Sequence, residues 1–190
     1  MHSMRWRHPG LTCLAALLCA AAPAAAQDDG RFEIRNAYVE NVNGQWLLDV
    51  RLDLALADAA RQAFEEGVPL VLELEVEASV ERRFLPDETV VSFSRQWQLA
   101  YDAIAERYVV TDMAGGEQAT YATQADAFAA LARPPEVPVA DEATLPGDSR
   151  FDMRVRAAVE IGELPAAIKM LLFWKSWSRS TDWYAWSVRP

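Results

Sequence analysis

Three long runs of alternating apolar and polar side chains constrain the fold of this chain more than any other feature. They cover residues 46–56, 70–80 and 151–161, and in each run the charged side chains fall opposite the apolar ones. A period of two with one charged face is typical of an antiparallel strand that buries one face and leaves the other in water. The runs therefore argue against a parallel sheet covered on both sides.

Shorter patterns extend this architecture along the chain. Further strands are predicted at 32–42, 91–101, 107–113 and 183–188, and short helices at 58–66, 123–132 and 166–177. Asn43-Gly44 separates the first two strands and favours a tight hairpin turn, because both residues tolerate positive φ. The sequence predicts a mainly β fold, a single antiparallel β-sandwich with short helices in the connections; a partly open barrel is the alternative.

The first 26 residues have the pattern of a secretory signal peptide. Arg5 and Arg7 precede the apolar stretch Leu11–Ala22, and Ala24-Ala25-Ala26 is a small-residue cleavage site. We predict cleavage after Ala26, a periplasmic or secreted protein, and one β-rich domain over residues 27–190. An uncleaved membrane anchor is the alternative, although the apolar stretch is too short to cross a bilayer.

Cleavage at this site would leave a chain without cysteine or histidine. Cys13, Cys19, His2 and His8 are the only residues of these types, and all precede the site. Their loss excludes disulfides, thiol or histidine catalysis, and metal sites built on these side chains. It also changes the net charge from −10 to −12, because two arginines and no acids are removed. A chain with this net negative charge is not expected to bind nucleic acid or anionic lipid, which it would repel.

The sequence carries no recognisable catalytic motif. It has no G-x-S-x-G, Walker or G-x-G-x-x-G pattern, and Lys169 and Lys175 are its only lysines. Lys175 adjoins Ser176, but neighbouring residues on a helix do not face each other. We predict a non-enzymatic protein without catalytic residues or cofactor; a carboxylate-dependent hydrolase is the least supported alternative.

An acidic stripe on the predicted strand at 70–80 is the sharpest polar feature. Its members are Glu73, Glu75, Glu77 and, just beyond the strand, Glu81. Carboxylates in a row repel one another unless neighbouring bases compensate them, and the candidate bases are Arg51, Arg154 and Arg156. A calcium site is the alternative, but a flat row of oxygens does not form the cage that Ca²⁺ requires. We therefore expect no metal site.

Two irregularities interrupt the strand pattern. Residues 133–149 contain four prolines and are predicted to form a long surface loop, which is uncommon unless the loop is functional or disordered. Arg95 falls on the apolar side of its strand, between Phe93 and Trp97. A buried arginine needs a carboxylate partner, and we favour instead a bulge or a sheet edge at this point.

The C-terminal residues hold the candidate binding patch. Its members are Trp174, Trp177, Trp183 and Trp186. The helix predicted at 166–177 is apolar nearly all round, so we expect it to pack on the core; exposure to a membrane surface, a partner or an apolar ligand is the alternative. Tyr184, Trp186 and Val188 share one face of the last strand. Trp183 points the other way and is the tryptophan we expect to be partly exposed.

Several short motifs are distributed over nearly the whole chain after residue 26, and their order and spacing are distinctive. They are Phe32-x-Ile34 with Ala37-Tyr38, Gly67-Val68-Pro69-Leu70, Arg82-Arg83, Leu99-x-Tyr101 with Tyr108, Phe151-x-x-Arg154-x-Arg156, Leu164-Pro165 and Trp183-x-x-Trp186. In these motifs the chain resembles the family called domain of unknown function 4390. The resemblance implies an exported proteobacterial protein and brings no catalytic residue. Members of the family tend to be encoded near a membrane sensor kinase of the two-component type, which hints at a regulatory role in the envelope.

Together these features favour a periplasmic protein-interaction or envelope-regulatory module. Its expected partner is an envelope protein such as a membrane sensor kinase, and neither nucleic acid nor stable membrane insertion is expected. A carrier or sensor of an apolar ligand in a tryptophan-lined cavity is the alternative function.

Overall fold

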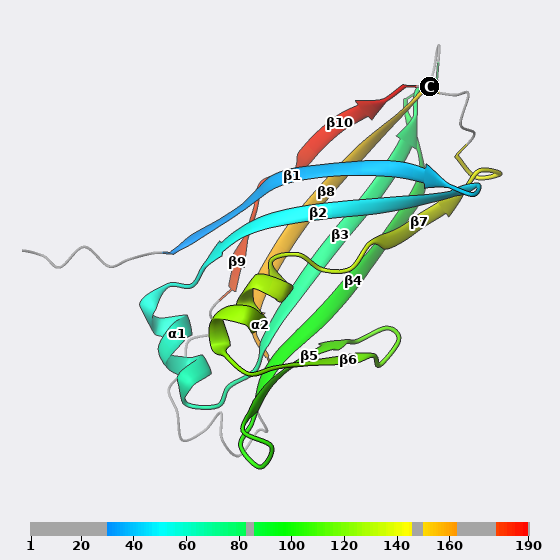
Figure 1. Ribbon diagram of the computed structural model, residues 1–190. Helices are drawn as coiled ribbons and strands as arrows, with labels where there is room; N and C mark the ends of the chain where they lie inside the picture. Colours follow the sequence, from blue (N-terminus) through cyan, green and yellow to red (C-terminus); the bar gives the residue numbers. More distant parts are fainter. Residues whose placement is uncertain (1–29, 83–85, 146–149, 163–177, 190) are drawn as a thin grey trace, which may run out of the picture.

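The computed structural model describes residues 30–82, 86–145, 150–162 and 178–189, which form two open antiparallel sheets and two short helices (Figure 1). One sheet has seven strands and the other has three. The predicted mainly β fold is confirmed. No strand pairing joins the two sheets within these residues, which is consistent with the predicted sandwich.

The large sheet has the strand order β10-β8-β3-β4-β5-β6, and β9 also pairs with β8. Its strands are β3 (Leu70–Val80), β4 (Glu88–Asp102), β5 (Arg107–Asp112), β6 (Gln118–Tyr121), β8 (Phe151–Ile161), β9 (Ser178–Ser180) and β10 (Tyr184–Val188). The long strands β8, β3 and β4 form its centre, and the alternating runs at 70–80 and 151–161 coincide with β3 and β8. The shortest strands, β6 and β9, are the ones that the sequence pattern does not reveal, because three or four residues are too few to show a period.

Arg95 of β4 lies at a sheet edge and not at a bulge. The favoured bulge is absent, since the β3–β4 register shifts only between Ala78 and Ser79. The sheet-edge interpretation holds, because β5 pairs with β4 only from Trp97 onward. Arg95 also has a carboxylate partner, Asp112, to which it donates a 2.7 Å hydrogen bond.

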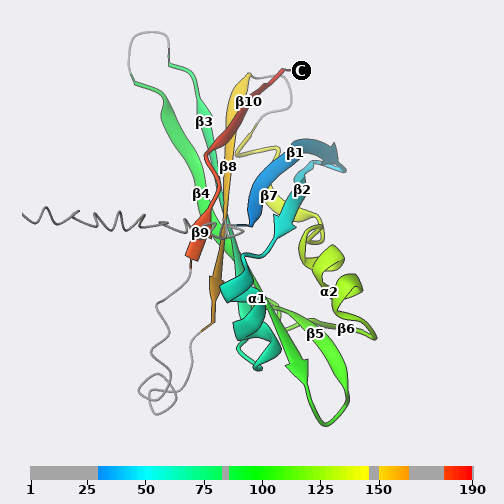
Figure 2. The same ribbon diagram turned by 90° about the vertical axis from the view of Figure 1, so that its left-hand side faces the viewer.

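The small sheet consists of β1 (Arg31–Val42), β2 (Gln45–Ala55) and β7 (Val137–Asp141), in the order β1-β2-β7. Asn43 and Gly44 join β1 to β2 with φ values of 53° and 83°, which confirms the predicted hairpin. Helices α1 (Asp58–Glu65) and α2 (Gln124–Leu131) confirm two of the predicted helices. Both lie on the same side of the large sheet as the small sheet (Figure 2).

The core lies between the large sheet and this second layer. Leu70, Leu72 and Leu74 of β3 have exposed fractions of 0%, and the alternate residues of β8 are buried equally well. From the small sheet, Trp46 meets Phe151 of β8 edge to face, with ring centroids 5.1 Å apart. Burial of the apolar face of each alternating strand is the main stabilising contribution to this fold.

The predicted surface loop at 133–149 is interrupted by strand β7. Val137 is 2% exposed and pairs with Leu48 of β2. Pro138 is accommodated because β7 is the edge of its sheet, where a missing N–H costs no ladder bond. After β7, Leu145 is fully buried and its carbonyl oxygen accepts a 2.7 Å hydrogen bond from Trp46 Nε1. These contacts tie much of the expected loop to the core.

Two predicted segments lie outside the described ranges. They are the signal peptide at 1–26 and the helix at 166–177, which includes Trp174 and Trp177. Within the ranges that are described, no helix is long and apolar enough to cross a membrane.

Candidate functional site: a groove between two sheet edges

The edge of the large sheet next to β8 is formed by two short strands with a bulge between them. Ser180 of β9 pairs with Ala158, and Tyr184 of β10 pairs with Val155. Residues 181–183 of the edge therefore oppose only residues 156 and 157 of β8. One extra residue in an edge strand is a β-bulge, which breaks the pairing locally and redirects side chains.

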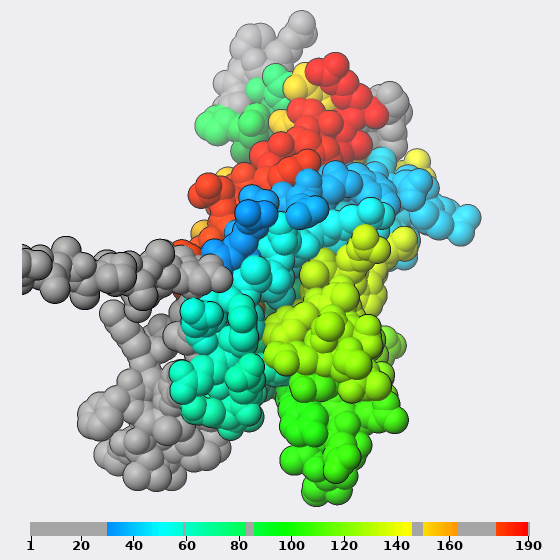
Figure 3. All heavy atoms as spheres, turned by 60° about the vertical axis from the view of Figure 1, so that its left-hand side comes forward, coloured from blue at the N-terminus to red at the C-terminus, as the bar shows by residue number. Residues whose placement is uncertain are grey.

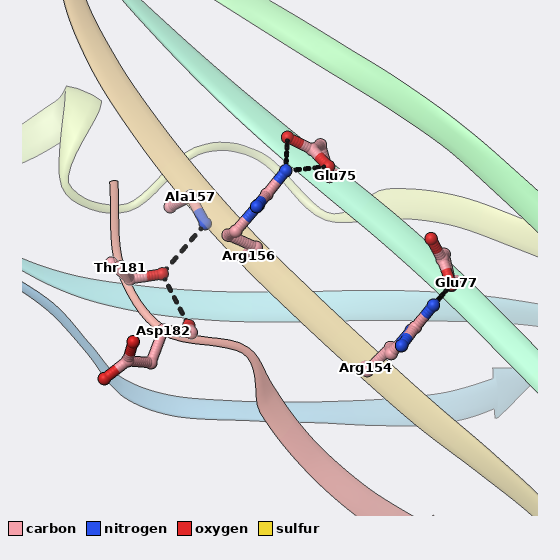
Figure 4. Close-up of polar contacts among 7 residues, drawn as sticks. All are labelled: Glu75, Glu77, Arg154, Arg156, Ala157, Thr181 and Asp182. Atoms are coloured by element: carbon pink, nitrogen blue, oxygen red, sulfur yellow. Dashed lines mark hydrogen bonds and ion pairs between the residues drawn. The ribbon is translucent and has the colours of Figure 1, made fainter. Parts of the chain in front are cut away.

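Thr181 replaces the pairing that the bulge removes (Figure 4). Its backbone N–H donates to the Ala157 carbonyl at 2.8 Å, and the Ala157 N–H donates to Thr181 Oγ1 at 3.1 Å. The hydroxyl in turn donates to the Asp182 carbonyl at 2.8 Å. Thr181 is buried, so these bonds fix the path of the chain into Trp183.

The bulge places Trp183 on the outer face of the large sheet, away from the core. Its ring lies 4.7 Å from the guanidinium carbon of Arg154 and 4.9 Å from that of Arg156. Guanidinium groups over an indole ring are attracted by its π electrons, by about 0.5–1 kcal/mol at an exposed site. Trp183 is half-buried as a result.

Both arginines are held from their other side by the acidic stripe of β3. Arg154 Nε donates to Glu77 at 2.6 Å, and Arg156 Nη2 donates to both carboxylate oxygens of Glu75 at 2.7 Å (Figure 4). The predicted cross-strand ion pairs are thus confirmed for Arg154 and Arg156. The expectation for Arg51 is wrong, since it lies on β2 in the other sheet, 3.8 Å from Asp49. We call Trp183, Arg154, Arg156, Glu75 and Glu77 the Trp183 cluster.

Strand β1, the edge of the small sheet, also carries a bulge. Ile34 pairs with Leu52 and Asn36 pairs with Arg51, so residue 35 is inserted between them. Arg35 turns to Asp53 and donates to its carboxylate at 2.7 Å. This hydrogen bond is the largest cause that lowers the pKa of Asp53 below its usual value.

The two bulged edges border a common groove. Figure 3 shows the β9–β10 segment, in red, lying directly beside β1, in blue. The groove has a volume of about 350 Å³ and is lined by residues 32–34 of β1 and residues 180–184. We call it the edge groove. Trp183 belongs both to the lining of the groove and to the Trp183 cluster, so it connects the two.

Trp183 and Trp186, the two candidate tryptophans within the described residues, lie on opposite faces of the large sheet. Trp183 lies on the outer face, as its alternation with Tyr184 predicts. Trp186 lies on the inner face, opposite Met153 and 5.7 Å from the Tyr184 ring. Charge pattern predicts Arg154 and Arg156 only as counter-ions of the glutamates. Their contact with Trp183 could not be predicted, because a one-residue bulge leaves no mark in the sequence.

The carboxylates of the Trp183 cluster already have hydrogen-bond partners. Glu77 accepts from Arg154, and Glu75 accepts from Arg156. Among the described residues no group of three or more His, Cys, Asp or Glu side chains could hold a metal ion.

Fold and groove together define an antiparallel β protein with a groove between one edge of each of its two sheets. Residues 29–187 match the family model described as Domain of unknown function (DUF4390), and the chain belongs to this family. The resemblance seen in the sequence motifs is thereby confirmed. No curated protein and no solved structure matches the chain.

Proposed function

We propose that this protein is a non-enzymatic periplasmic interaction module that binds an extended segment of another envelope protein in the edge groove. The observation that carries the proposal is the position of Trp183. Its ring is held on the outer face by two arginines, beside a groove between two strand edges. The signal-peptide pattern at residues 1–26 supports the periplasmic location.

The composition of the Trp183 cluster supports a role in protein binding. Tryptophan and arginine are enriched among the residues that contribute most to protein–protein affinity. Ion pairs with Glu75 and Glu77 already fix the two arginine side chains. A partner that contacts them therefore loses less side-chain entropy on binding than it would on mobile arginines.

The sheet edges support an extended segment as the bound element. Within the described residues, β1 and β10 are each the last strand of their sheet order and have a strand neighbour on one side only. An extended peptide can add to such an edge through main-chain hydrogen bonds, while pockets beside the edge select its side chains. The groove beside Trp183 supplies such a pocket.

The proposed partner is the outer domain of a membrane sensor kinase, because members of the family tend to be encoded near such a kinase. Both proteins would meet in the periplasm, where the extended segment could come from a loop or linker of the sensor. A chain without histidine or cysteine after residue 26 fits a regulatory contact better than a catalytic one.

Site-specific photocrosslinking in cells tests the proposal. A photoreactive amino acid replaces Asp182, which is exposed at the groove, and in a second strain it replaces Thr120, which is exposed on β6. We expect a discrete adduct with one envelope protein from position 182 and none from position 120. Mass spectrometry identifies the partner, and its purified outer domain is then titrated with the purified chain.

Trp183→Ala should weaken this binding by about 30-fold, the effect of a residue worth about 2 kcal/mol at an interface. Tyr101→Ala is the matched control, because Tyr101 is an exposed aromatic residue of β4 outside the groove. Equal adducts from positions 182 and 120, or equal affinity of the Trp183→Ala chain, would disprove the proposal.

A further inference from the structure

The outer face of the small sheet carries a group of exposed apolar and acidic side chains. This face is turned to the viewer in Figure 1, with the large sheet behind it. On β1, Tyr38, Glu40 and Val42 alternate onto the outer face, whereas Ala37 is buried on the inner one. Tyr38 is 39% exposed and Val42 is 43% exposed. Exposed apolar side chains that form a patch, unlike single ones, indicate an interaction surface.

Cross-strand pairing joins these side chains to those of β2 and β7. Tyr38 pairs with Asp49 of β2, and Glu40 pairs with Leu47. Leu47 pairs on its other side with Pro138 of β7. Side chains that are paired directly on one face of a sheet have Cβ atoms about 4.5–5.5 Å apart, so they form one continuous surface.

Three carboxylates act on the Tyr38 hydroxyl. The charge of Asp49 is the largest cause that raises the pKa of Tyr38 above its usual value, and partial burial and the charges of Glu40 and Glu136 act in the same direction. Arg51 opposes them, and its Nε lies 3.8 Å from Asp49. Three acids against one base give this surface a negative potential that attracts a cation. We call this surface the Tyr38 face; it consists of Tyr38, Glu40, Val42, Leu47, Asp49, Glu136 and Pro138.

The two glutamates of the Tyr38 face are accessible to a partner. Glu40 and Glu136 are exposed, and neither forms an ion pair within the residues that the structure describes. At the other end of β2, by contrast, Asp53 is already paired with Arg31 and Arg35. Two acids beside Tyr38 thus remain without a counter-ion in the described part of the chain.

We propose that the Tyr38 face docks an arginine-bearing segment of another protein. The guanidinium lies against the tyrosine ring and donates to the glutamates, because this planar cation both stacks on aromatic rings and pairs with carboxylates. Val42, Leu47 and Pro138 contact apolar side chains next to the arginine, which a small free cation lacks. None of these residues lines the edge groove, so this docking does not depend on the proposed function.

Two matched peptides test the proposal by nuclear magnetic resonance. Both are capped pentapeptides in which valine alternates with a second residue, which is arginine in one peptide and its neutral analogue citrulline in the other. The chain is labelled with ¹³C-tyrosine, so that its five tyrosines report separately. Tyr38 reports on the Tyr38 face and Tyr184 on the edge groove, whereas Tyr101, exposed on β4, reports on unspecific binding.

We expect the arginine peptide to shift the Tyr38 resonances saturably and to leave those of Tyr101 and Tyr184 in place. The citrulline peptide should bind about tenfold more weakly, because it makes no charge-assisted hydrogen bond to a carboxylate. Higher ionic strength should weaken the arginine peptide alone, since salt screens exposed charges. Equal affinity of the two peptides would overturn the proposal. A response at Tyr184 in place of Tyr38 would also overturn it, while supporting binding in the edge groove.

Paired substitutions locate the binding. Glu40→Gln together with Glu136→Gln removes both glutamates of the face and should weaken the arginine peptide about tenfold. Glu65→Gln together with Glu66→Gln is the matched control, because it removes the same charge from exposed positions at the end of α1 and should change the affinity by less than about twofold. All four positions are exposed, and thermal unfolding checks that both variants fold. Equal losses in the two double variants would show that net charge alone attracts the peptide, and would overturn the proposal.

Discussion

Thr181 Oγ1 accepts a hydrogen bond from the backbone N–H of Ala157 at 3.1 Å, so a side chain takes the place of a strand partner at the edge of the large sheet. This bond stabilises the bulge that turns Trp183 outward. It also satisfies a buried N–H group that the interrupted edge would otherwise leave without a partner.

Thr181→Val should destabilise the protein by about 1–3 kcal/mol, because it keeps the shape of the side chain and removes the acceptor for a buried N–H. Urea unfolding measures the change in the free energy of unfolding. Thr120→Val is the control, since Thr120 is exposed on β6, and it should change stability by less than about 0.5 kcal/mol. Equal effects of the two substitutions would contradict the role assigned to Thr181.

Trp183 and Arg156 should be energetically coupled. A double-mutant cycle with Trp183→Leu and Arg156→Met is expected to give a coupling energy of about 0.5–1 kcal/mol, the strength of an exposed cation–π contact. Replacing Arg156→Met by Arg107→Met, at an exposed residue of β5, should give additive effects. Additivity in the first cycle would show that the ring and the guanidinium do not interact in solution.

Asp112→Ala should destabilise the protein by about 2 kcal/mol, because it leaves the half-buried guanidinium of Arg95 unpaired and removes the acceptor of the following turn. The double variant with Arg95→Met should recover part of the loss, since no cation is then left without a counter-ion. Chemical denaturation of the three chains measures this. A double variant less stable than Asp112→Ala alone would argue against the ion pair.

The pair of Arg35 and Asp53 predicts a pH dependence of stability. The hydrogen bond from Arg35 lowers the pKa of Asp53 in the folded protein, so the folded chain releases this proton more readily than the unfolded chain. The stabilisation is therefore complete above the ordinary aspartate pKa of 3.8 and is lost as the pH falls through the lower folded-state value. Asp53→Asn should flatten the stability profile in this acidic range. Glu65→Gln, at an exposed carboxylate of α1, should leave the contribution of Asp53 in place.

Trp46→Phe should loosen the segment around β7, because the Leu145 carbonyl loses its 2.7 Å hydrogen bond from the indole. Hydrogen exchange should show reduced protection of the β7 amides and a loss of overall stability of about 2 kcal/mol. Trp186→Phe, on β10, is the control and should leave the β7 amides protected. Unchanged protection of β7 in Trp46→Phe would contradict this anchoring role.

The strands could be predicted from the alternation of apolar and polar residues, because successive side chains of a half-buried strand point to opposite faces of the sheet. The runs at Trp46, Leu70 and Phe151 therefore locate the three long central strands, and Asn43-Gly44 marks the hairpin through its positive φ values. Strand β7 was not predicted, because the prolines of this segment indicate a loop, whereas an edge strand tolerates Pro138. Whether a proline lies on an edge is a property of the whole sheet.

Part of the candidate site could likewise be predicted from the sequence, and part could not. Alternation alone put Trp183 opposite Tyr184 and Trp186, and charge alone suggested that Arg154 and Arg156 pair with the glutamates of β3. Only the tertiary structure brings β1 beside β9 and β10 and forms the edge groove, because these strands are far apart in the chain.

The sequence by itself determined the family, the strand content and the face on which most strand side chains lie. These follow from local periods and motifs, which act over a few residues. The tertiary structure alone decided which edges meet and where one extra residue interrupts the pairing. Those outcomes depend on packing between distant segments, where a shift of a single residue moves a side chain to the opposite face.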